Sequence, residues 1–199
     1  RYLNYPGFNA IFFRRTYQEI VRSVEPYMRN FYYAAGGTYN EQKHRWSFPS
    51  GAYIDIGYME HETDWMSYQG TSYCAQLFDE LTQFQWNQYK MLAAWNRSTV
   101  PGITPYRRST TNPGGSCHAQ GKQHFIDTCP PVPVGPMKFS ELTQLWWQPR
   151  KPGATHWFKD ESGQLLSRRF IPSSVFDNED GIRNNPNYIS QLLSLEPNK

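Results

Sequence analysis

The sequence contains no long hydrophobic run and little cysteine, and each absence excludes a class of protein. No apolar stretch approaches the length of a signal-peptide core or a membrane span. The three cysteines, Cys74, Cys117 and Cys129, form an odd number without the spacing of a disulfide framework. We therefore expect a soluble protein of a reducing compartment.

Two catalytic or metal-binding patterns are also absent. No G-x-S-x-G stretch occurs, which disfavours a nucleophilic serine hydrolase. Cys117, His118, His124 and Cys129 have the spacing C-H-x5-H-x4-C, without the close C-x2-C or H-x3-H pairs of a structural zinc site. The net charge of +3 and pI near 8.7 do not indicate a strongly basic nucleic-acid surface.

The chain is long enough for one domain. It has 199 residues, of which 38% are hydrophobic and 17% aromatic, so one core is the simplest expectation. Residues 9–15, NAIFFRR, predict a strand, and Thr16 and Glu19 have the spacing of a capping box at a helix start. Pro26 predicts that this helix ends or bends near Glu25, before a second helical piece.

The middle of the chain alternates strand and helix patterns. Apolar residues recur with period two over 43–58, which predicts a hairpin with Ala52, Ile54, Ile56 and Tyr58 on one face. Residues 72–78 predict a strand, although Gln76 interrupts their apolar character. Thr82 and Gln85 have capping spacing and predict the start of the following helix.

The last third of the chain is rich in turn signals. A strand is predicted to end at Thr110, followed by a tight N-P-G-G corner and a helix carrying Lys122. Residues 129–136 predict a proline-rich connector, 155–172 a hairpin turning at 161–163, and 185–195 a terminal helix. Strands alternating with helices favour an α/β fold with a mostly parallel central sheet and hairpin insertions.

Asp79 and Glu80 stand at the end of a predicted buried strand, where a charged side chain is costly unless a cation pairs with it. Parallel sheets place their chemistry at the carboxyl ends of strands, so we expect Asp79, Glu80 and Asn112 to converge there. In nucleotide hydrolysis the first carboxylate of such a pair can hold magnesium through water, and the second can activate the attacking water. Taken singly, Asp-Glu is more often a helix-capping pair, and N-P-G-G is usually a turn.

Ordered sequence blocks supply the context that single motifs lack. The chain resembles the large terminase subunit of tailed bacteriophages through these five stretches: YPGFNAIFFRRTYQEI, FPSGAYIDIGYME, YQGTSYCAQLFDELTQFQWNQY, TTNPGGSCHAQGKQHFID and FIPSSVFDN. The resemblance implies that Asp79 is the magnesium residue and Glu80 the catalytic residue of a Walker B element. It assigns Thr110, Thr111 and Asn112 to the coupling motif that links hydrolysis to movement, with ATP and Mg²⁺ as cofactors.

The same resemblance implies the wider role of the protein. It implies a P-loop NTPase-like (ASCE) ATPase domain that drives double-stranded DNA into the prohead, as a homo-oligomeric ring, with the portal protein and small terminase subunit as partners, in the host cytoplasm and without a membrane. No G-x-x-x-x-G-K-[ST] loop occurs in these residues. We therefore expect 1–199 to be a partial ATPase domain, incomplete at the N-terminus, without the Walker A segment or the nuclease domain, and inactive on its own.

Two questions stay open at the level of sequence. Gln69-Gly70 stands where many relatives place an arginine for the neighbouring subunit's nucleotide, and Arg97 and Arg107 are the other candidates, although a solvated surface explains either. The alternative function is a non-catalytic DNA-binding or capsid- or portal-interaction module. Paired cations and stacking aromatics motivate it: Arg14-Arg15, Arg107-Arg108, Arg150-Lys151, Arg168-Arg169 and Trp146-Trp147.

Overall fold

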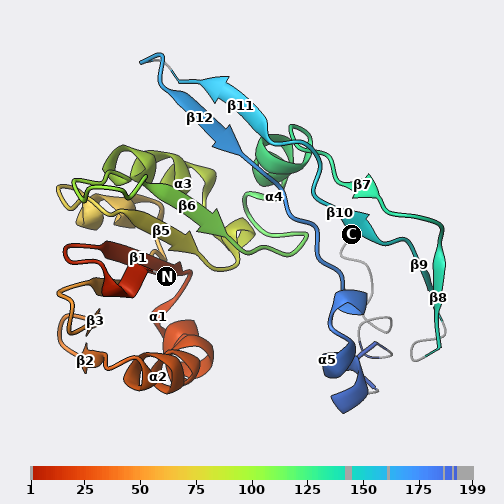
Figure 1. Cartoon of the computed structure of the whole chain (residues 1–199), viewed down its shortest axis with the longest axis horizontal. Helices are drawn as coiled ribbons and strands as arrows, with labels where there is room; N and C mark the ends of the chain where they lie inside the picture. The colour runs from red at the N-terminus through yellow and green to blue at the C-terminus, as the bar shows by residue number, and fades with distance from the viewer. Residues whose placement is uncertain (1, 142–144, 161, 186, 190, 192–199) are drawn as a thin grey trace. The chain divides into compact units, whose positions relative to one another are not determined.

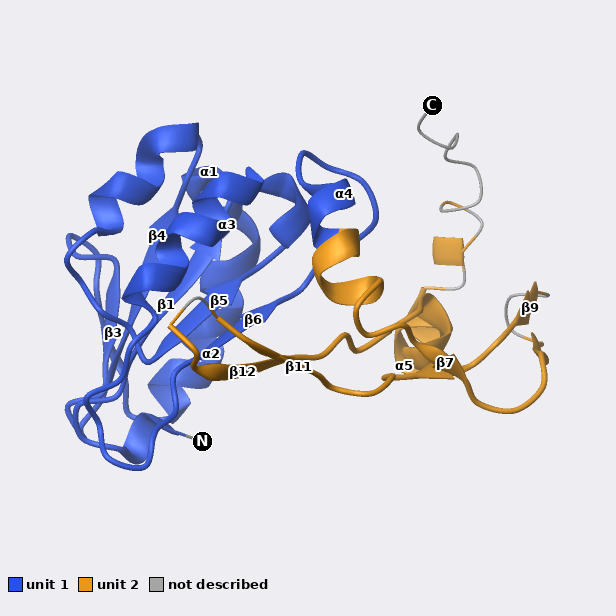
Figure 2. Cartoon of the chain, turned by 90° about the horizontal axis from the view of Figure 1, so that it is seen from above, with its two compact units in different colours: residues 1–121 blue, residues 122–199 orange. Residues whose placement is uncertain are grey.

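The computed structural model describes residues 2–141, 145–160, 162–185, 187–189 and 191. The chain forms two compact units, residues 1–121 and residues 122–199, which Figure 2 colours separately. The first unit contains a six-stranded sheet with helices, and the second contains short two-stranded pairs.

The sheet of the first unit has the strand order β2-β3-β4-β1-β5-β6 (Figure 1). Strands β4, β1, β5 and β6 are parallel neighbours, whereas β2 and β3 join antiparallel at the edge beyond β4. This confirms the predicted α/β class with a mixed, mostly parallel sheet. The strands are β1 (Asn9–Arg14), β2 (Thr38–Asn40), β3 (Arg45–Ser47), β4 (Tyr53–Tyr58), β5 (Ala75–Phe78) and β6 (Tyr106–Ser109).

Helical segments connect these strands. The α-helices are α1 (Tyr17–Glu19), α2 (Glu25–Ala34), α3 (Trp86–Leu92) and α4 (His118–Gly121). A π-helical stretch, η2 (Ile20–Val24), joins α1 to α2. The tighter 3₁₀ segments are η1 (Tyr2–Asn4), η3 (Glu62–Tyr68), η4 (Leu81–Gln83) and η5 (Ala93–Trp95).

Strand β1 is buried because both faces of the sheet are covered. Adjacent residues of a strand point to opposite faces. Phe12 lines a groove with α2 residues, whereas Phe13 packs against Tyr68 of η3 and stacks on Phe78 at a centroid distance of 5.0 Å. Phe13 is completely buried, which stabilises the fold by about 1.5–3 kcal/mol.

The helix after β1 starts as predicted. The Thr16 hydroxyl accepts from the Glu19 backbone N–H, and the Glu19 carboxylate accepts from the Thr16 N–H, which is a complete capping box. Pro26 does not end the helical run. It stands in the first turn of α2, and the change from the π-helical stretch η2 to α2 falls at Glu25, where the end or bend was predicted.

The predicted hairpin over 43–58 is confirmed as β3 and β4. Residues 54–57 of β4 are all buried, so this strand is covered on both faces of the sheet. Ile54 and Ile56 are buried, Asp55 between them is also buried, and Tyr58 is exposed. The burial of Asp55 is possible because Arg45 and Tyr73 bind its carboxylate.

The helix predicted after β5 begins later than its capping signal indicated. Leu81–Gln83 forms the short segment η4, and Thr82 lies inside this segment rather than at the N-cap of a helix. Gln85 is the N-cap of α3 and forms a capping box with Gln88. The Thr82 hydroxyl instead donates to the Asn112 carbonyl, a long-range contact that local spacing does not reveal.

In the second unit, the described residues form three antiparallel strand pairs. Its elements are η6 (Lys122–Ile126, π-helical), β7 (Val132–Pro133), β8 (Lys138–Ser140), β9 (Leu145–Trp147), β10 (Arg150–Lys151), β11 (His156–Lys159), β12 (Leu165–Arg168), η7 (Val175–Asp177) and α5 (Glu179–Asn184). The proline-rich stretch predicted as a connector contains β7, which pairs with β10. The predicted hairpin is confirmed as β11 and β12. Position 161 of its turn and much of the predicted helix over 185–195 lie outside the described residues.

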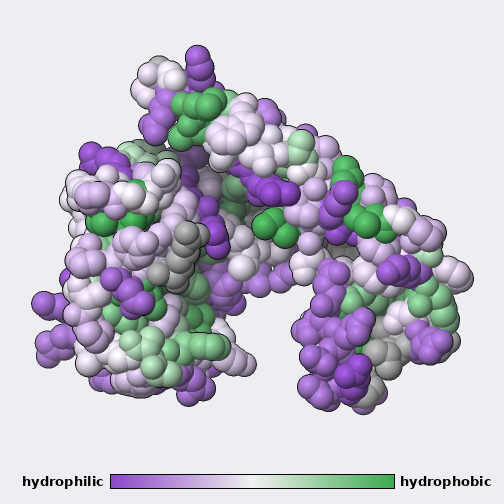
Figure 3. Space-filling view, in the orientation of Figure 1, coloured by the Kyte–Doolittle hydropathy of each residue, from purple (hydrophilic) through white to green (hydrophobic). Residues whose placement is uncertain are grey.

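Surface hydropathy differs between elements of the second unit (Figure 3). The α5 segment is hydrophilic, in keeping with its sequence EDGIRN. The β11–β12 hairpin exposes apolar side chains, including Trp157 at 61% and Leu165 at 58%. Within the described part of the chain, none of the helices combines the length and apolarity that crossing a bilayer requires.

Candidate active site

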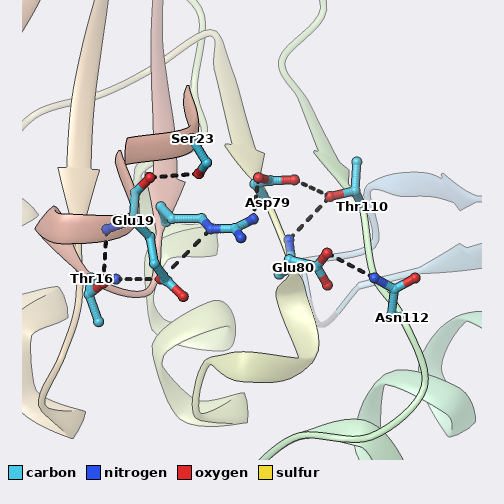
Figure 4. A network of polar contacts seen from close by, with 8 residues as sticks. Thr16, Glu19, Ser23, Asp79, Glu80, Thr110 and Asn112 are labelled. Carbon is cyan, nitrogen blue, oxygen red and sulfur yellow. Dashed lines mark hydrogen bonds and ion pairs between the residues drawn. The ribbon is translucent and has the colours of Figure 1, made fainter. Parts of the chain in front are cut away.

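The two predicted motifs leave the sheet next to each other. Strands β5 and β6 are parallel, and Phe78 at the end of β5 is paired with Ser109 at the end of β6. Residues 79–80 and 110–112 follow directly, so they meet at the carboxyl edge of the sheet (Figure 4). The structure thus brings together the residues that sequence analysis selected as site candidates.

Asp79 is held on both carboxylate oxygens. Oδ2 accepts a hydrogen bond from Arg14 of β1, and Oδ1 accepts one from the Thr110 hydroxyl. Its backbone N–H donates to the Phe13 carbonyl at 2.9 Å, which continues the β1–β5 ladder by one residue. The Asp79 side chain is 26% exposed and lines a groove of about 600 Å³ together with apolar residues of α2. A solvent-accessible carboxylate is thereby fixed at the mouth of a groove.

Glu80 turns sharply out of the strand. Its backbone is left-handed, with φ 54° and ψ 55°. Its N–H donates to the Thr110 hydroxyl at 3.1 Å, and its Oε1 accepts from the Asn112 side-chain amide at 2.9 Å (Figure 4). The turn gives the two neighbouring carboxylates separate partners.

The loops after β5 and β6 are hydrogen-bonded to each other along their length. The Leu81 N–H donates to the Thr110 carbonyl at 2.9 Å, and the Thr82 hydroxyl donates to the Asn112 carbonyl at 3.0 Å. The Thr111 hydroxyl donates to the Thr82 hydroxyl at 3.1 Å. We call these paired loops, residues 80–83 and 110–117, the loop clasp.

Gly115 allows the two loops of the clasp to lie close together. Gly115 has a φ of +87°, and a Cβ at this position would clash with the Thr82 carbonyl. That carbonyl accepts from the Cys117 N–H at 3.1 Å, just before α4 begins. The clasp encloses a surface depression of about 300 Å³ lined by Glu80, Thr82, Gln83 and residues 112–115.

Arg14 is a site residue that sequence analysis did not select. Its guanidinium contacts Asp79, and its Nε lies 3.7 Å from Glu19 Oε2. The signal was available, because Arg14 ends a strand that runs parallel to β5 and therefore reaches the same edge of the sheet. It was missed because Arg14-Arg15 also has the appearance of an ordinary surface cation pair.

Comparison with known proteins identifies the family. The family model described as terminase large subunit, T4likevirus-type, N-terminal, matches residues 1–199. The chain belongs to this family. No curated protein matched the sequence.

Solved terminase structures share the fold at low sequence identity. One crystal form of the large terminase from a thermophilic bacteriophage is 18% identical, with a TM-score of 0.50, over 62% of this chain and 30% of that chain. Another crystal form of the same phage's enzyme, in complex with ADP, is 15% identical, with a TM-score of 0.47, over 60% of this chain and 31% of that chain. The matched region of this terminase chain therefore spans about 30% of the solved terminase it resembles.

The donor set of this terminase chain fits magnesium held together with a nucleotide. Among the described residues, no group of three His, Cys, Asp or Glu side chains could hold a metal ion. Nucleotide-bound magnesium does not require such a cage, because one or two carboxylates, phosphate oxygens and waters complete its shell. Asp79 is partly exposed at the end of β5 and lines the groove, and its carboxylate, now bound by Arg14 and Thr110, is the kind of oxygen ligand that such an ion needs.

Arg107 is engaged within its own unit. Its guanidinium carbon lies 3.5 Å from the centroid of the Tyr89 ring, and it donates to the Tyr89 carbonyl. Burial lowers the pKa of Arg107. This side chain packs on α3, which does not favour a role for it at a neighbouring subunit's nucleotide.

The cysteines of the terminase chain are not arranged for catalysis. Cys74, Cys117 and Cys129 are buried and free. Burial raises the pKa of Cys117, whose thiol donates to the Leu81 carbonyl at 3.3 Å. A protonated, enclosed thiol is a poor nucleophile, so Cys117 serves the packing of the loop clasp.

Proposed function

We propose that this chain is part of the ATPase domain of a phage large terminase and carries its metal-holding, catalytic and coupling residues. The observation that supports this most is the meeting of Asp79, Glu80, Thr110 and Asn112 at the carboxyl edge of two neighbouring parallel strands. In a member of the terminase family, that edge is where hydrolysis of a nucleotide is expected.

Each residue has a role suited to its surroundings. Asp79 would hold the magnesium of Mg-ATP, which would neutralise charge on the phosphates. Glu80 is assigned the role of general base, and its left-handed turn gives its carboxylate a position separate from that of Asp79. Asn112 binds Glu80 at 2.9 Å and can exchange this contact for phosphate or water. Thr110 and Thr111 fix the two loops to each other.

The loop clasp supports a coupling role. Glu80 and Asn112 are joined by a hydrogen bond, so a movement of the Glu80 side chain would act directly on Asn112. The loop 110–117 connects Asn112 to α4. We propose that the intact protein uses this link to move double-stranded DNA into the prohead, as a ring of subunits working with the portal protein and the small terminase subunit in the host cytoplasm. The 199-residue chain alone should hydrolyse little ATP, because no phosphate-cradling G-x-x-x-x-G-K-[ST] loop occurs in it.

The alternative of a non-catalytic DNA-binding module has less support. Its argument depends on free cations, but Arg14 contacts Asp79, and Arg15 donates to the carbonyls of Met59 and Glu60. The first cation pair is therefore used inside the first unit. Arg107 of the second pair packs on Tyr89.

The test of the proposed chemistry is Glu80→Gln in the full-length subunit. Loss of the general base should lower the rate constant of ATP hydrolysis by about 10²–10⁴-fold, while ATP affinity changes little. Steady-state hydrolysis and equilibrium binding of a fluorescent ATP analogue measure the two effects. Glu62→Gln, an exposed glutamate of η3, is the matched control and should leave both unchanged. Hydrolysis by Glu80→Gln at the rate of the unmodified protein would refute the role of Glu80.

A further inference from the structure

Arg14 lies between two carboxylates that belong to different elements. Its Nη1 donates to Asp79 after β5, and its Nε lies 3.7 Å from Glu19 of α1. The Arg14 side chain is only 15% exposed, against 26% for Asp79 and 36% for Glu19. One guanidinium group thus lies near two carboxylates at the edge of the sheet, and it is largely shielded from water.

We propose that Arg14 is an exchangeable counter-ion of the site. It neutralises Asp79 in the absence of a divalent cation and transfers to Glu19 when a cation occupies Asp79. Arg14 is then a positioning residue, which acts through Asp79 rather than on the nucleotide. This inference rests on the proposed function, in which Asp79 holds magnesium.

The contacts of Asp79 place Arg14 in competition with a bound cation. Both of its oxygens already have partners, Arg14 on Oδ2 and Thr110 on Oδ1. A hydroxyl can rotate to accommodate a new ligand, but a guanidinium cannot lose its charge. A divalent cation beside Asp79 would therefore repel Arg14, and the two cations compete for the same carboxylate.

The contacts of Arg14 show where it would go. Its Nε is buried and makes no hydrogen bond, although Glu19 Oε2 lies only 3.7 Å away. Moving closer to Glu19 would satisfy that N–H and keep the charge paired. The transfer replaces one ion pair by another, so it needs neither a new charge nor a new acceptor.

Glu19 is fixed well enough to receive the charge. Its Oε2 accepts from the Thr16 N–H at 3.1 Å, and its own N–H donates to the Thr16 hydroxyl at 3.2 Å. This capping box sets the start of α1, which continues through η2 into α2. Occupation of Asp79 would thereby be sensed at the first turn of the helical segment that covers one face of the sheet.

The experiment measures Mn²⁺ binding to the full-length subunit by electron paramagnetic resonance of the free ion, with and without ADP. Arg14→Gln removes the competing cation and should tighten Mn²⁺ binding on the order of fivefold, the scale of a partly exposed ion pair. Glu19→Gln keeps the capping acceptor but removes the second acid, so Arg14 stays on Asp79 and Mn²⁺ binding should weaken by a similar factor. General structural damage would not be expected to strengthen Mn²⁺ binding in one variant and weaken it in the other.

Two further variants control the result. Arg14→Lys keeps a positive charge that competes for Asp79, so Mn²⁺ affinity should stay closer to that of the unmodified protein than in Arg14→Gln. Arg29→Gln removes an arginine that pairs with Glu25 away from the site and should have no effect. Thermal unfolding of every variant establishes that it is folded. If Arg14→Gln does not fold, Glu19→Gln decides, since an unchanged Mn²⁺ affinity there overturns the exchange.

The outcomes separate this inference from the proposed function. Unchanged affinity in both Arg14→Gln and Glu19→Gln, or a change of the same sign in both, overturns the exchange. Asp79→Asn tests the proposed metal site itself and should abolish the part of the Mn²⁺ binding that depends on ADP. Full Mn²⁺ binding by Asp79→Asn would overturn the metal role of Asp79, whatever Arg14 does.

Discussion

At the residue scale, the most unusual feature of the site is the backbone of Glu80. It has a left-handed conformation that costs a non-glycine residue about 1 kcal/mol. The conformation persists because the Glu80 N–H donates to the Thr110 hydroxyl and its carbonyl accepts from the Gln83 N–H. The side chain that the proposed chemistry needs is thus held in a backbone geometry that favours glycine.

Glu80→Gly should therefore stabilise the fold while abolishing ATP hydrolysis. We expect the free energy of unfolding to rise by about 0.5 kcal/mol, because the relieved strain exceeds the entropy that glycine adds to the unfolded chain. Denaturant titration of the chain measures this, and hydrolysis is assayed in the full-length subunit. Gln83→Gly, in the helical turn η4 that follows, should instead lower stability by about 0.5–1 kcal/mol. A loss in Glu80→Gly as large as that in Gln83→Gly would contradict the argument.

At the element scale, a buried carboxylate connects three segments of the sheet. Asp55 of β4 is 8% exposed and accepts from Arg45 of β3 at 2.5 and 2.9 Å. It also accepts from the Tyr73 hydroxyl, just before β5, at 2.8 Å. Burial, together with the charge of Asp55, raises the pKa of Tyr73. The Arg45–Asp55 ion pair thereby joins the antiparallel edge of the sheet to its parallel centre, in addition to the backbone hydrogen bonds between β3 and β4.

Asp55→Asn should destabilise the fold by about 2 kcal/mol, because Arg45 loses its counter-ion in a partly buried position. Denaturant titration followed by circular dichroism measures the loss. Asp127→Asn is the matched control, since its pair with Lys122 is about half exposed on both sides, and it should cost about 0.5 kcal/mol or less. Equal losses in the two variants would show that burial of the Asp55 pair contributes nothing.

Elements that depend on local signals could be predicted from the sequence. The Thr16–Glu19 capping box is an example, because its partners are three residues apart. Elements that depend on long-range contacts could not. Gln76 looked like an interruption of β5, yet it is fully buried and donates to the Leu92 carbonyl at the end of α3 at 2.7 Å. Thr82 looked like a helix cap because its real partner, Asn112, is 30 residues away.

At the scale of the whole molecule, the location of the candidate site followed from topology alone. Parallel strands place their carboxyl ends at one edge, so two strand-end motifs were predicted to meet, and the structure places 79–80 beside 110–112. The same rule applied to β1 would have added Arg14. What topology could not provide was the left-handed turn at Glu80 or the second acid, Glu19, since both depend on atomic contacts around the edge.

The two compact units differ in how much apolar surface they bury. Residues 1–121 contain a core that includes Phe13, Trp46 and Phe78, each at most 1% exposed. Among the described residues of 122–199, the buried apolar side chains are Cys129, Ile182 and Ile189. Two-stranded pairs with so little buried surface are marginally stable on their own.

We therefore expect the two units to open with different free energies. In hydrogen–deuterium exchange followed by mass spectrometry, backbone amides of β1 and β5 should exchange roughly a hundredfold or more slowly than those of β11 and β12. Both sets of amides are hydrogen-bonded in ladders, so hydrogen bonding alone would give them similar protection. The expected contrast arises because β1 and β5 open only when the core around Phe13 is lost, whereas the hairpin can separate without it. Equal protection of the two sets would mean that the hairpin shares the cooperative unfolding of the first unit.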